Sequence, residues 1–311
     1  MNNNLEISIR QNLSPTEIDM VSKLFHAVSF AIDHPPLGEH RWLDLVIGGR
    51  QAHYAILAST SKSDSHLVGY AQISRSRSDW AIDLVVHPRI RGTSDDPSKK
   101  LLSEGLNLVS QSGGGHVHWW VPRPNDLDDE LAKELHFARG RDLMQLRCTL
   151  PLPQNFSNEL EGFEIRGFET NKDELEWLEV NNQAFAWHPE QGGWTLEILR
   201  SRQKESWFDP NGFLIHEIQS KIAGFCWTKV HRDANPVMGE IYVIAVHPRH
   251  QSSGIGRKLV IAGLDYLAKI DTQIGMLYVD STNKAALGLY YKLGFETNHI
   301  DRAYVFDAQS H

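Results

Sequence analysis

The sequence predicts a mixed α/β fold that occurs twice in tandem, and two observations carry this prediction. First, an apolar strand over residues 240–246 leads through the glycine-containing turn 251–256 into a helix, and a second strand at 276–279 precedes a helix that Gly294 closes. Second, much of this pattern also occurs about 160 residues earlier in the chain. A strand that is apolar at nearly every position is typical of a sheet covered on both faces.

Short matching segments reveal the repeat. Residues 84–89 (LVVHPR) parallel residues 244–249 (IAVHPR) at an offset of 160, and residues 135–137 (LHF) parallel residues 293–295 (LGF) at an offset of 158. Two copies of one strand–turn–helix unit therefore fill the chain. Its 311 residues are enough for two domains of ordinary size.

The domain boundary is expected in the polar, proline-containing segment 149–155. We therefore expect an N-terminal domain over residues 1–150 and a C-terminal catalytic domain over residues 160–311. The 41% of hydrophobic and 23% of charged residues are those of a soluble globular protein. The chain contains neither an apolar run of roughly 20 residues that would cross a bilayer nor a signal peptide at its start.

Composition also restricts the partners. Two cysteines make no disulfide framework, so we expect a protein of the reducing cytoplasm. The formal charge of −8 argues against nucleic acid as the main partner. Sixteen histidines are present, but none of them has the spacing of a zinc site, so we expect no metal. We expect a monomer that acts on a small molecule, without a membrane partner.

The turn after the 240–246 strand indicates an anion site. It reads Gln251-Ser252-Ser253-Gly254-Ile255-Gly256 and is followed by Arg257 at the start of the helix. Two glycines at a helix start allow a bulky phosphate to approach the backbone N–H groups, and the helix dipole favours an anion there. The spacing fits neither the dinucleotide fingerprint nor a nucleotide P-loop. The alternative at this stage is an ordinary strand-to-helix turn.

The pattern Gln-x-x-Gly-x-Gly resembles the pyrophosphate loop of the GNAT acetyltransferase superfamily. A second segment, from Asn283 through a tyrosine-containing helix to Leu-Gly-Phe, is similar to the last conserved segment of a GNAT domain. The resemblance implies two tandem GNAT domains and acetyl-CoA as the acetyl donor. It implies that the donor is bound by strand residues Ile244, Ala245 and Val246, by turn residues Gln251, Ser252, Ser253, Gly254, Ile255, Gly256 and Arg257, and by helix residues Asn283, Lys284, Ala285, Ala286, Leu287 and Gly288.

The same resemblance suggests the catalytic groups. Glu240, at the first position of the apolar strand, is the candidate general base, because an α-amino group needs only a modest push at neutral pH. Its structural alternative is a solvated charge at a strand end. Tyr290 is the candidate general acid for the departing thiolate, and Tyr291 competes with it for this role.

Two further segments suggest the acceptor. The polar and aromatic residues 181–194 and 225–231 lie where GNAT folds build the acceptor site. Residues 180–194, 239–257 and 277–283, within the tandem architecture, resemble the mycothiol synthase family. That family acetylates the cysteinyl amine of cysteinyl-glucosaminyl-inositol. The resemblance implies that the acceptor contacts Glu39, Glu190, Lys229, Glu240 and Tyr278. The alternatives are another amine, such as an aminoglycoside or a protein N-terminus, and a catalytically silent acyl-CoA-binding module.

The N-terminal half departs from the family pattern. Members of the family can hold a second acetyl-CoA there, through residues such as Leu84, Val85 and Val86. At the offset of 160, however, the loop glycines are replaced by Ser94 and Asp96, and a carboxylate would repel a pyrophosphate. Trp80 stands in place of Glu240 and Ala132 in place of Tyr290, unless a one-residue shift brings Asp83 to the base position. We expect a structural half that shapes the substrate cleft.

Overall fold

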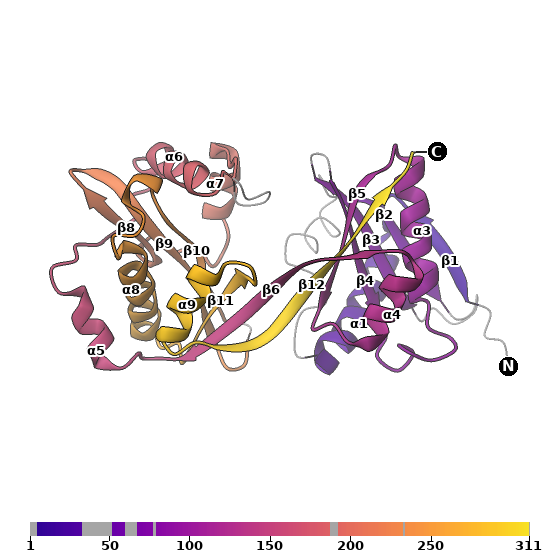
Figure 1. Ribbon diagram of the computed structural model, residues 1–311. Helices are drawn as coiled ribbons and strands as arrows, with labels where there is room; N and C mark the ends of the chain where they lie inside the picture. The colour runs from indigo at the N-terminus through magenta and orange to yellow at the C-terminus, as the bar shows by residue number, and fades with distance from the viewer. Residues whose placement is uncertain are drawn as a thin grey trace. The chain divides into compact units, whose positions relative to one another are not determined.

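The computed structural model describes residues 5–32, 52–59, 67–76, 79–186, 192–232 and 234–310. The chain forms two compact units, one of residues 1–142 with 300–311 and one of residues 143–299 (Figure 1). Both units mix helices with a sheet that has parallel and antiparallel strand pairs. The predicted α/β fold class is therefore confirmed.

The first unit carries one copy of the repeat. Its strand order is β1-β2-β3-β4-β5-β12, in which β4 and β5 are parallel. Its core combines the sheet with α1, α3 and α4, and contains the buried indoles of Trp80 and Trp119. The elements that belong to this unit alone are β1 (Glu6–Arg10), α1 (Pro15–Ile32), β2 (Ala52–Ser59), β3 (Leu67–Ser76), β4 (Asp79–Val86), α3 (Ser98–Gln111), β5 (Gly115–Pro122) and α4 (Asp126–Glu134).

The second unit carries the other copy. Its strand order is β6-β11-β10-β9-β8-β7, in which β10 and β11 are parallel. Figure 1 shows β8, β9 and β10 as neighbouring strands, with α6 and α7 together and α8 and α9 together. The elements are α5 (Gln154–Ser157), η1 (Asn158–Leu160), β7 (Arg166–Gly167), α6 (Glu174–Ala184), α7 (Leu196–Gln203), η2 (Pro210–Gly212), β8 (Phe213–Ile218), β9 (Lys221–His231), β10 (Met238–Val246), η3 (Pro248–His250), α8 (Ile255–Lys269), β11 (Ile274–Asp280) and α9 (Lys284–Lys292).

The two faces of the second sheet have different cores. One face packs on α8 and α9 through Cys226, Leu259 and Leu287. The other face packs on α6 and α7 through an aromatic cluster that includes Trp177 and Trp227. Because side chains alternate along a strand, even-numbered residues of β9 from Gly224 onward face α8 and odd-numbered residues face the aromatic cluster. A bulge in the pairing with β8 reverses this order for Ile222 and Ala223.

Two long strands cross between the units. These are β6 (Ala138–Thr149) and β12 (Glu296–Ala308), drawn in magenta and yellow in Figure 1. Residues 143–149 of β6 pair with β11 of the second unit, whereas residues 301–308 of β12 pair with β5 of the first. The last strand in the sequence of each half therefore pairs within the sheet of the other unit. The sequence led us to expect a boundary near residue 150, whereas the two units divide after residue 142 and again after residue 299. The difference arises because β6 and β12 each continue from one sheet into the other.

An acidic side chain on β12 should make stability depend on pH. Asp301 lies opposite Pro122 of β5, and burial raises its pKa from 3.8 to about 6, while the Arg123 backbone N–H acts in the opposite direction. The folded state therefore binds this proton more tightly than the unfolded state, so stability should fall as pH rises from about 4 to about 6.

Asp301→Asn removes this ionisation. We expect its free energy of unfolding at pH 7 to exceed that of wild type by on the order of 1–2 kcal/mol, after an allowance for solvent screening, and the gain to vanish near pH 4. Urea unfolding at both pH values measures this difference. Glu296→Gln, an exposed position on the same strand, is the control. A gain that is equal at both pH values would contradict the explanation.

Candidate functional site

The strand β10 has an irregular backbone where the donor is expected. Its antiparallel register with β9 shifts between Ile241 and Val243, so a bulge leaves Tyr242 as the extra residue. Its parallel register with β11 covers only Met238–Glu240, although both strands continue beyond it. The two strands thus diverge, and the predicted residues Ile244, Ala245 and Val246 lie on the part of β10 beyond this pairing.

The turn after β10 has the geometry of an anion site. Gly254 is the N-cap of α8 with φ +84, a backbone conformation that glycine adopts easily. Gly256 has a different role, because a Cβ there would meet only Val246, at an ordinary distance of 3.5 Å. Internal packing does not require glycine at 256, whereas close approach of an external group would. The first N–H groups of a helix have no partner within it, so they are available to an anion here.

Arg257 is engaged within the protein. Its Nε and Nη2 donate to the two carboxylate oxygens of Glu159 at 2.7 and 2.8 Å, and its guanidinium lies 5.5 Å from the centre of the Phe156 ring. The hydrogen bond to Arg257 holds the pKa of Glu159 below its ordinary range. The cation predicted beside the pyrophosphate is therefore already paired with a carboxylate from η1.

The second GNAT-like segment begins with a helix cap. The side chain of Asn283 accepts the N–H of Ala286 at 3.1 Å and so starts α9. Asn125, which the 158-residue offset pairs with Asn283, likewise caps α4, where its side chain accepts the N–H of Leu127 at 2.9 Å. Of the other residues predicted to bind the donor, Leu287 is buried, whereas a Cβ at Gly288 would meet open space. Lys284, Ala285 and Ala286 form the first turn of α9.

The predicted base is buried and held by a histidine. Glu240 is 8% exposed, and its Oε2 lies 2.7 Å from Nε2 of His231 on β9. Lys229 is the residue directly opposite Glu240 in the ladder. Glu240 is therefore a buried carboxylate with a hydrogen-bond partner, and not a solvent-exposed charge at a strand end. Sequence reasoning missed His231, although its position two residues after Lys229 places both side chains on one face of β9.

The predicted acid lies in the other core. Tyr290 is buried in the cluster that contains Cys226, and burial raises the pKa of its hydroxyl well above the ordinary value, with a smaller contribution from Cys226. The competing Tyr291 is 45% exposed and its hydroxyl lies 3.2 Å from that of Thr297. Glu240 and Tyr290 therefore belong to opposite faces of the sheet.

The residues predicted to contact the acceptor gather in part on the Glu240 face. The Lys229 ammonium lies 4.7 Å from the centre of the Trp207 ring and 5.9 Å from that of Tyr242. The Tyr278 hydroxyl on β11 accepts a hydrogen bond from Nε2 of Gln145 at 2.8 Å.

Register extends this face to β6. Lys229, Glu240, Met276 and Arg147 lie side by side on β9, β10, β11 and β6. Arg147 donates to Gln145 at 2.8 Å. Sequence reasoning missed both β6 residues because they precede the expected linker. Glu39 and Glu190 lie outside the described residues.

The first unit repeats the turn but not the site. His87 and His247 both accept the N–H of the residue two positions later, at 3.2 and 3.1 Å, so the His-Pro-Arg motif folds alike in both copies. In contrast, β4, which contains Leu84, Val85 and Val86, pairs with β3 in an uninterrupted register over Asp79–Val86. The bulge of β10 therefore has no counterpart there.

A carboxylate fills the loop after β4. Asp96 accepts the backbone N–H of Gly92 at 2.7 Å and that of Ser98, the first residue of α3, at 2.9 Å. Arg91 pairs with the same carboxylate at 3.3 Å. Two of the backbone N–H groups around this helix start, those of Gly92 and Ser98, are thus satisfied within the chain.

The counterparts of the catalytic groups in the first unit are buried and apolar in character. Trp80 is 1% exposed and donates its indole N–H to the Gly114 carbonyl at 3.0 Å, and Ala132 is 3% exposed. Asp83, which a one-residue shift would bring to the base position, lies opposite Gln72 in the β3–β4 ladder.

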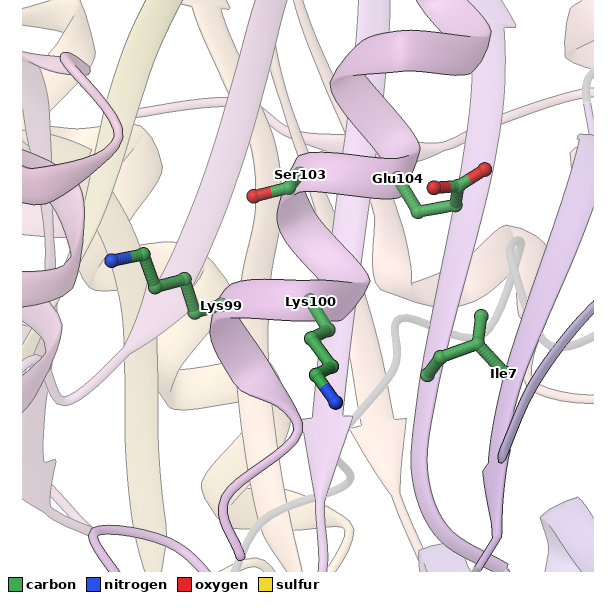
Figure 2. Close-up of a pocket in the computed structure, with 5 residues that line it drawn as sticks. All are labelled: Ile7, Lys99, Lys100, Ser103 and Glu104. Carbon is green, nitrogen blue, oxygen red and sulfur yellow. The ribbon is translucent and has the colours of Figure 1, made fainter. Parts of the chain in front are cut away.

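One hollow in the described residues lies outside the predicted site. Figure 2 shows an open hollow of the first unit between β1 and α3, lined by Ile7, Lys99, Lys100, Ser103 and Glu104, none of which belongs to the predicted site. Among the residues that the structure describes, no group of three His, Cys, Asp or Glu side chains is arranged to hold a metal ion. No helix in the described ranges has the length and apolar character needed to cross a membrane.

Comparison with known proteins places this site in a family. Residues 176–295 match the Acetyltransferase (GNAT) family. Two solved structures share the fold with TM-scores of 0.73: a GCN5-related N-acetyltransferase from Sphaerobacter thermophilus, at 20% identity over 97% of this chain and 96% of that one, and a tandem GNAT protein from the clavulanic acid biosynthesis pathway, at 14% identity over 99% and 100%. The predicted tandem GNAT fold is therefore confirmed.

Sequence relatives extend along the whole chain. Proteins named mycothiol acetyltransferase from Acidimicrobium ferrooxidans and Thermobispora bispora are 38% and 37% identical to it, over 94% and 96% of this chain and 94% and 99% of their own lengths. A third, from Nocardia farcinica, is 36% identical over 96% of this chain and 98% of its own. The chain is thus an acetyltransferase enzyme and belongs to the mycothiol acetyltransferase family.

Proposed function

We propose that the enzyme transfers the acetyl group of acetyl-CoA to the cysteinyl amine of cysteinyl-glucosaminyl-inositol, which is the last step of mycothiol biosynthesis. The observation that carries acetyl transfer is β10, which holds a buried carboxylate, bulges directly after it, diverges from β11 and ends at the glycine turn of α8. The full-length similarity to mycothiol acetyltransferases supports the acceptor.

In this proposal the donor lies along the second unit. The N–H groups of residues 251–257 bind the pyrophosphate, the backbone of residues 244–246 binds the pantetheine arm, and the first turns of α9 from Asn283 to Gly288 line the far side. A free N–H at the bulge polarises the thioester carbonyl. Glu159 must share or release Arg257 when this cation turns to the phosphates, because both Nε and Nη2 are occupied.

The chemistry then needs two proton transfers. Glu240 accepts the proton of the amine, directly or through one water, as the nitrogen attacks the thioester carbon. The carbon–sulfur bond breaks, and the departing thiolate takes the proton of the Tyr290 hydroxyl. The opposite placement of these groups suits a thioester held where β10 and β11 diverge, with the acceptor on the Glu240 face. Lys229, Tyr278, Glu39 and Glu190 contact the hydroxyl-rich acceptor.

We further propose that acetyl-CoA binds in the second unit alone, because the Asp96 carboxylate occupies the Gly92 and Ser98 N–H groups of the first unit and would repel a pyrophosphate. Both cysteines are free and buried, which suits action as a cytoplasmic monomer. Incubation with acetyl-CoA and a panel of amines, with mass detection of the product, tests the function. Cysteinyl-glucosaminyl-inositol should be acetylated fastest. Faster acetylation of an aminoglycoside or a peptide N-terminus would replace the proposed acceptor.

Tyr290→Phe should separate chemistry from binding. The substitution removes one oxygen and keeps the buried ring, so packing survives, and the burial that raises the pKa of Tyr290 also keeps its proton in place for the leaving group. We expect turnover to fall about 10- to 100-fold, because thiolate is a fairly good leaving group without help, while the KM for both substrates stays near wild type. Steady-state kinetics measures both quantities. Tyr291→Phe is the matched control and should leave turnover unchanged; the reverse result would assign the role to Tyr291.

A further inference from the structure

We propose that His231 is a positioning residue for the general base: it holds one oxygen of Glu240 so that the other accepts the proton of the acceptor amine. The inference rests on the proposed function of Glu240. Nothing in the sequence pattern or in the resemblance pointed to this histidine.

The contact is direct and partly shielded from solvent. Nε2 of His231 lies 2.7 Å from Oε2 of Glu240, and the two side chains are 28% and 11% exposed. In the ladder His231 is opposite Met238 and Glu240 is opposite Lys229, so the pair is a diagonal one across β9 and β10. An ionised carboxylate only accepts hydrogen bonds, which assigns the hydrogen to Nε2 of the imidazole. A fixed donor on Oε2 leaves Oε1 for the substrate.

The charged and titratable groups around the His231–Glu240 pair determine how the pH profile of a His231 variant is interpreted. Lys229 faces Glu240 from β9, and Met276 faces it from β11, with Arg147 of β6 next in the same row. Tyr278 and Asp280 are the titratable groups on this face of β11. These groups stay in place when His231 is changed. A change in the pH profile of a His231 variant can therefore be ascribed to the lost imidazole.

Two substitutions separate hydrogen bonding from shape. His231→Phe keeps a ring but removes the donor, so the carboxylate turns more freely and its protonated form is favoured. We expect kcat to fall about 10- to 100-fold, the KM for acetyl-CoA to stay within twofold, and the acidic limb of the rate profile to move to higher pH. His231→Gln restores an N–H donor near the Nε2 position and should recover most of kcat. His216→Phe, on β8 of the same unit, should behave as wild type.

The outcomes distinguish this inference from the proposed function. In the background of Glu240→Gln, His231→Phe should cost nothing further, because the group it orients is gone. A loss of activity in Glu240→Gln with wild-type rates and pH profile in His231→Phe would overturn the positioning role alone. Equal losses in the Phe and Gln variants, with a lowered melting temperature, would show a purely structural histidine and also overturn it. Full activity of Glu240→Gln would instead remove the proposed base.

Discussion

Glu240→Gln is expected to lower turnover by about 10²- to 10⁴-fold while the affinity for acetyl-CoA stays near wild type. The amide has almost the same shape as the carboxylate and can still meet His231, so the strand pairing around position 240 should survive. It cannot take a proton from the amine, and the variant must wait for amine that is already neutral. Its rate should therefore keep rising with pH where the wild-type rate has levelled off.

Pre-steady-state and steady-state rates across pH 6–9 (roughly the range in which an α-amino group titrates) measure this effect. Glu161→Gln, an exposed glutamate of the same unit, controls for the loss of one negative charge. A Glu240→Gln enzyme with the wild-type rate at neutral pH would exclude Glu240 as the base. A variant that fails to bind acetyl-CoA would point to a structural role for the carboxylate.

Gly254→Asp is expected to weaken acetyl-CoA binding by on the order of 10²- to 10³-fold. The new side chain would hold a left-handed backbone at φ +84, and its carboxylate would face the pyrophosphate across a few ångströms. Gly254→Ala carries the backbone cost without the charge and should weaken binding less. Gly256→Ala makes only an ordinary contact with Val246 and should fold normally, yet we expect its methyl group to obstruct the proposed approach of the pyrophosphate.

Titration calorimetry gives both the affinity and the number of sites. Wild type should bind one acetyl-CoA per chain, and Ser94→Asp, the corresponding loop position of the first unit, should leave the titration unchanged. Two strong sites of equal affinity would contradict the conclusion that Asp96 fills the first loop. In that case Asp96 would have to leave the N–H groups of Gly92 and Ser98 when the donor binds.

The sequence predicted those parts of the site that depend on local backbone. Gly254 has the positive φ typical of a turn glycine, Gly294 ends α9 with a positive φ, and the His-Pro-Arg turns match between the copies. Each of these depends on residues within a few positions of one another, so a short pattern can specify them. The roles of Glu240 and Tyr290 stay predictions.

Contacts between distant segments could not be predicted in the same way. Arg257 meets Glu159 across 98 positions, and Gln145 reaches Tyr278 across 133. Neither residue type nor spacing indicates such a pair. His231 and Glu240 are only nine positions apart, but their contact depends on the register of a hairpin, which the sequence leaves open. The strand exchange was missed because a repeat shows that two segments are alike and not which sheet each one joins.

Because β6 and β12 are exchanged, the unit that is repeated in the sequence is not the unit that folds. A single copy of the repeat, cut at residue 150, would keep the part of β6 that belongs to the other sheet and lose the part of β12 that completes its own. Such a half would expose a long unpaired edge, which is a template for association with another chain. Two identical halves could satisfy each other's edges only as a reciprocal pair. When both halves are joined in one polypeptide, the exchange no longer depends on protein concentration. The first copy can then lose its catalytic groups, but its last strand, β6, is still needed to complete the sheet of the second unit.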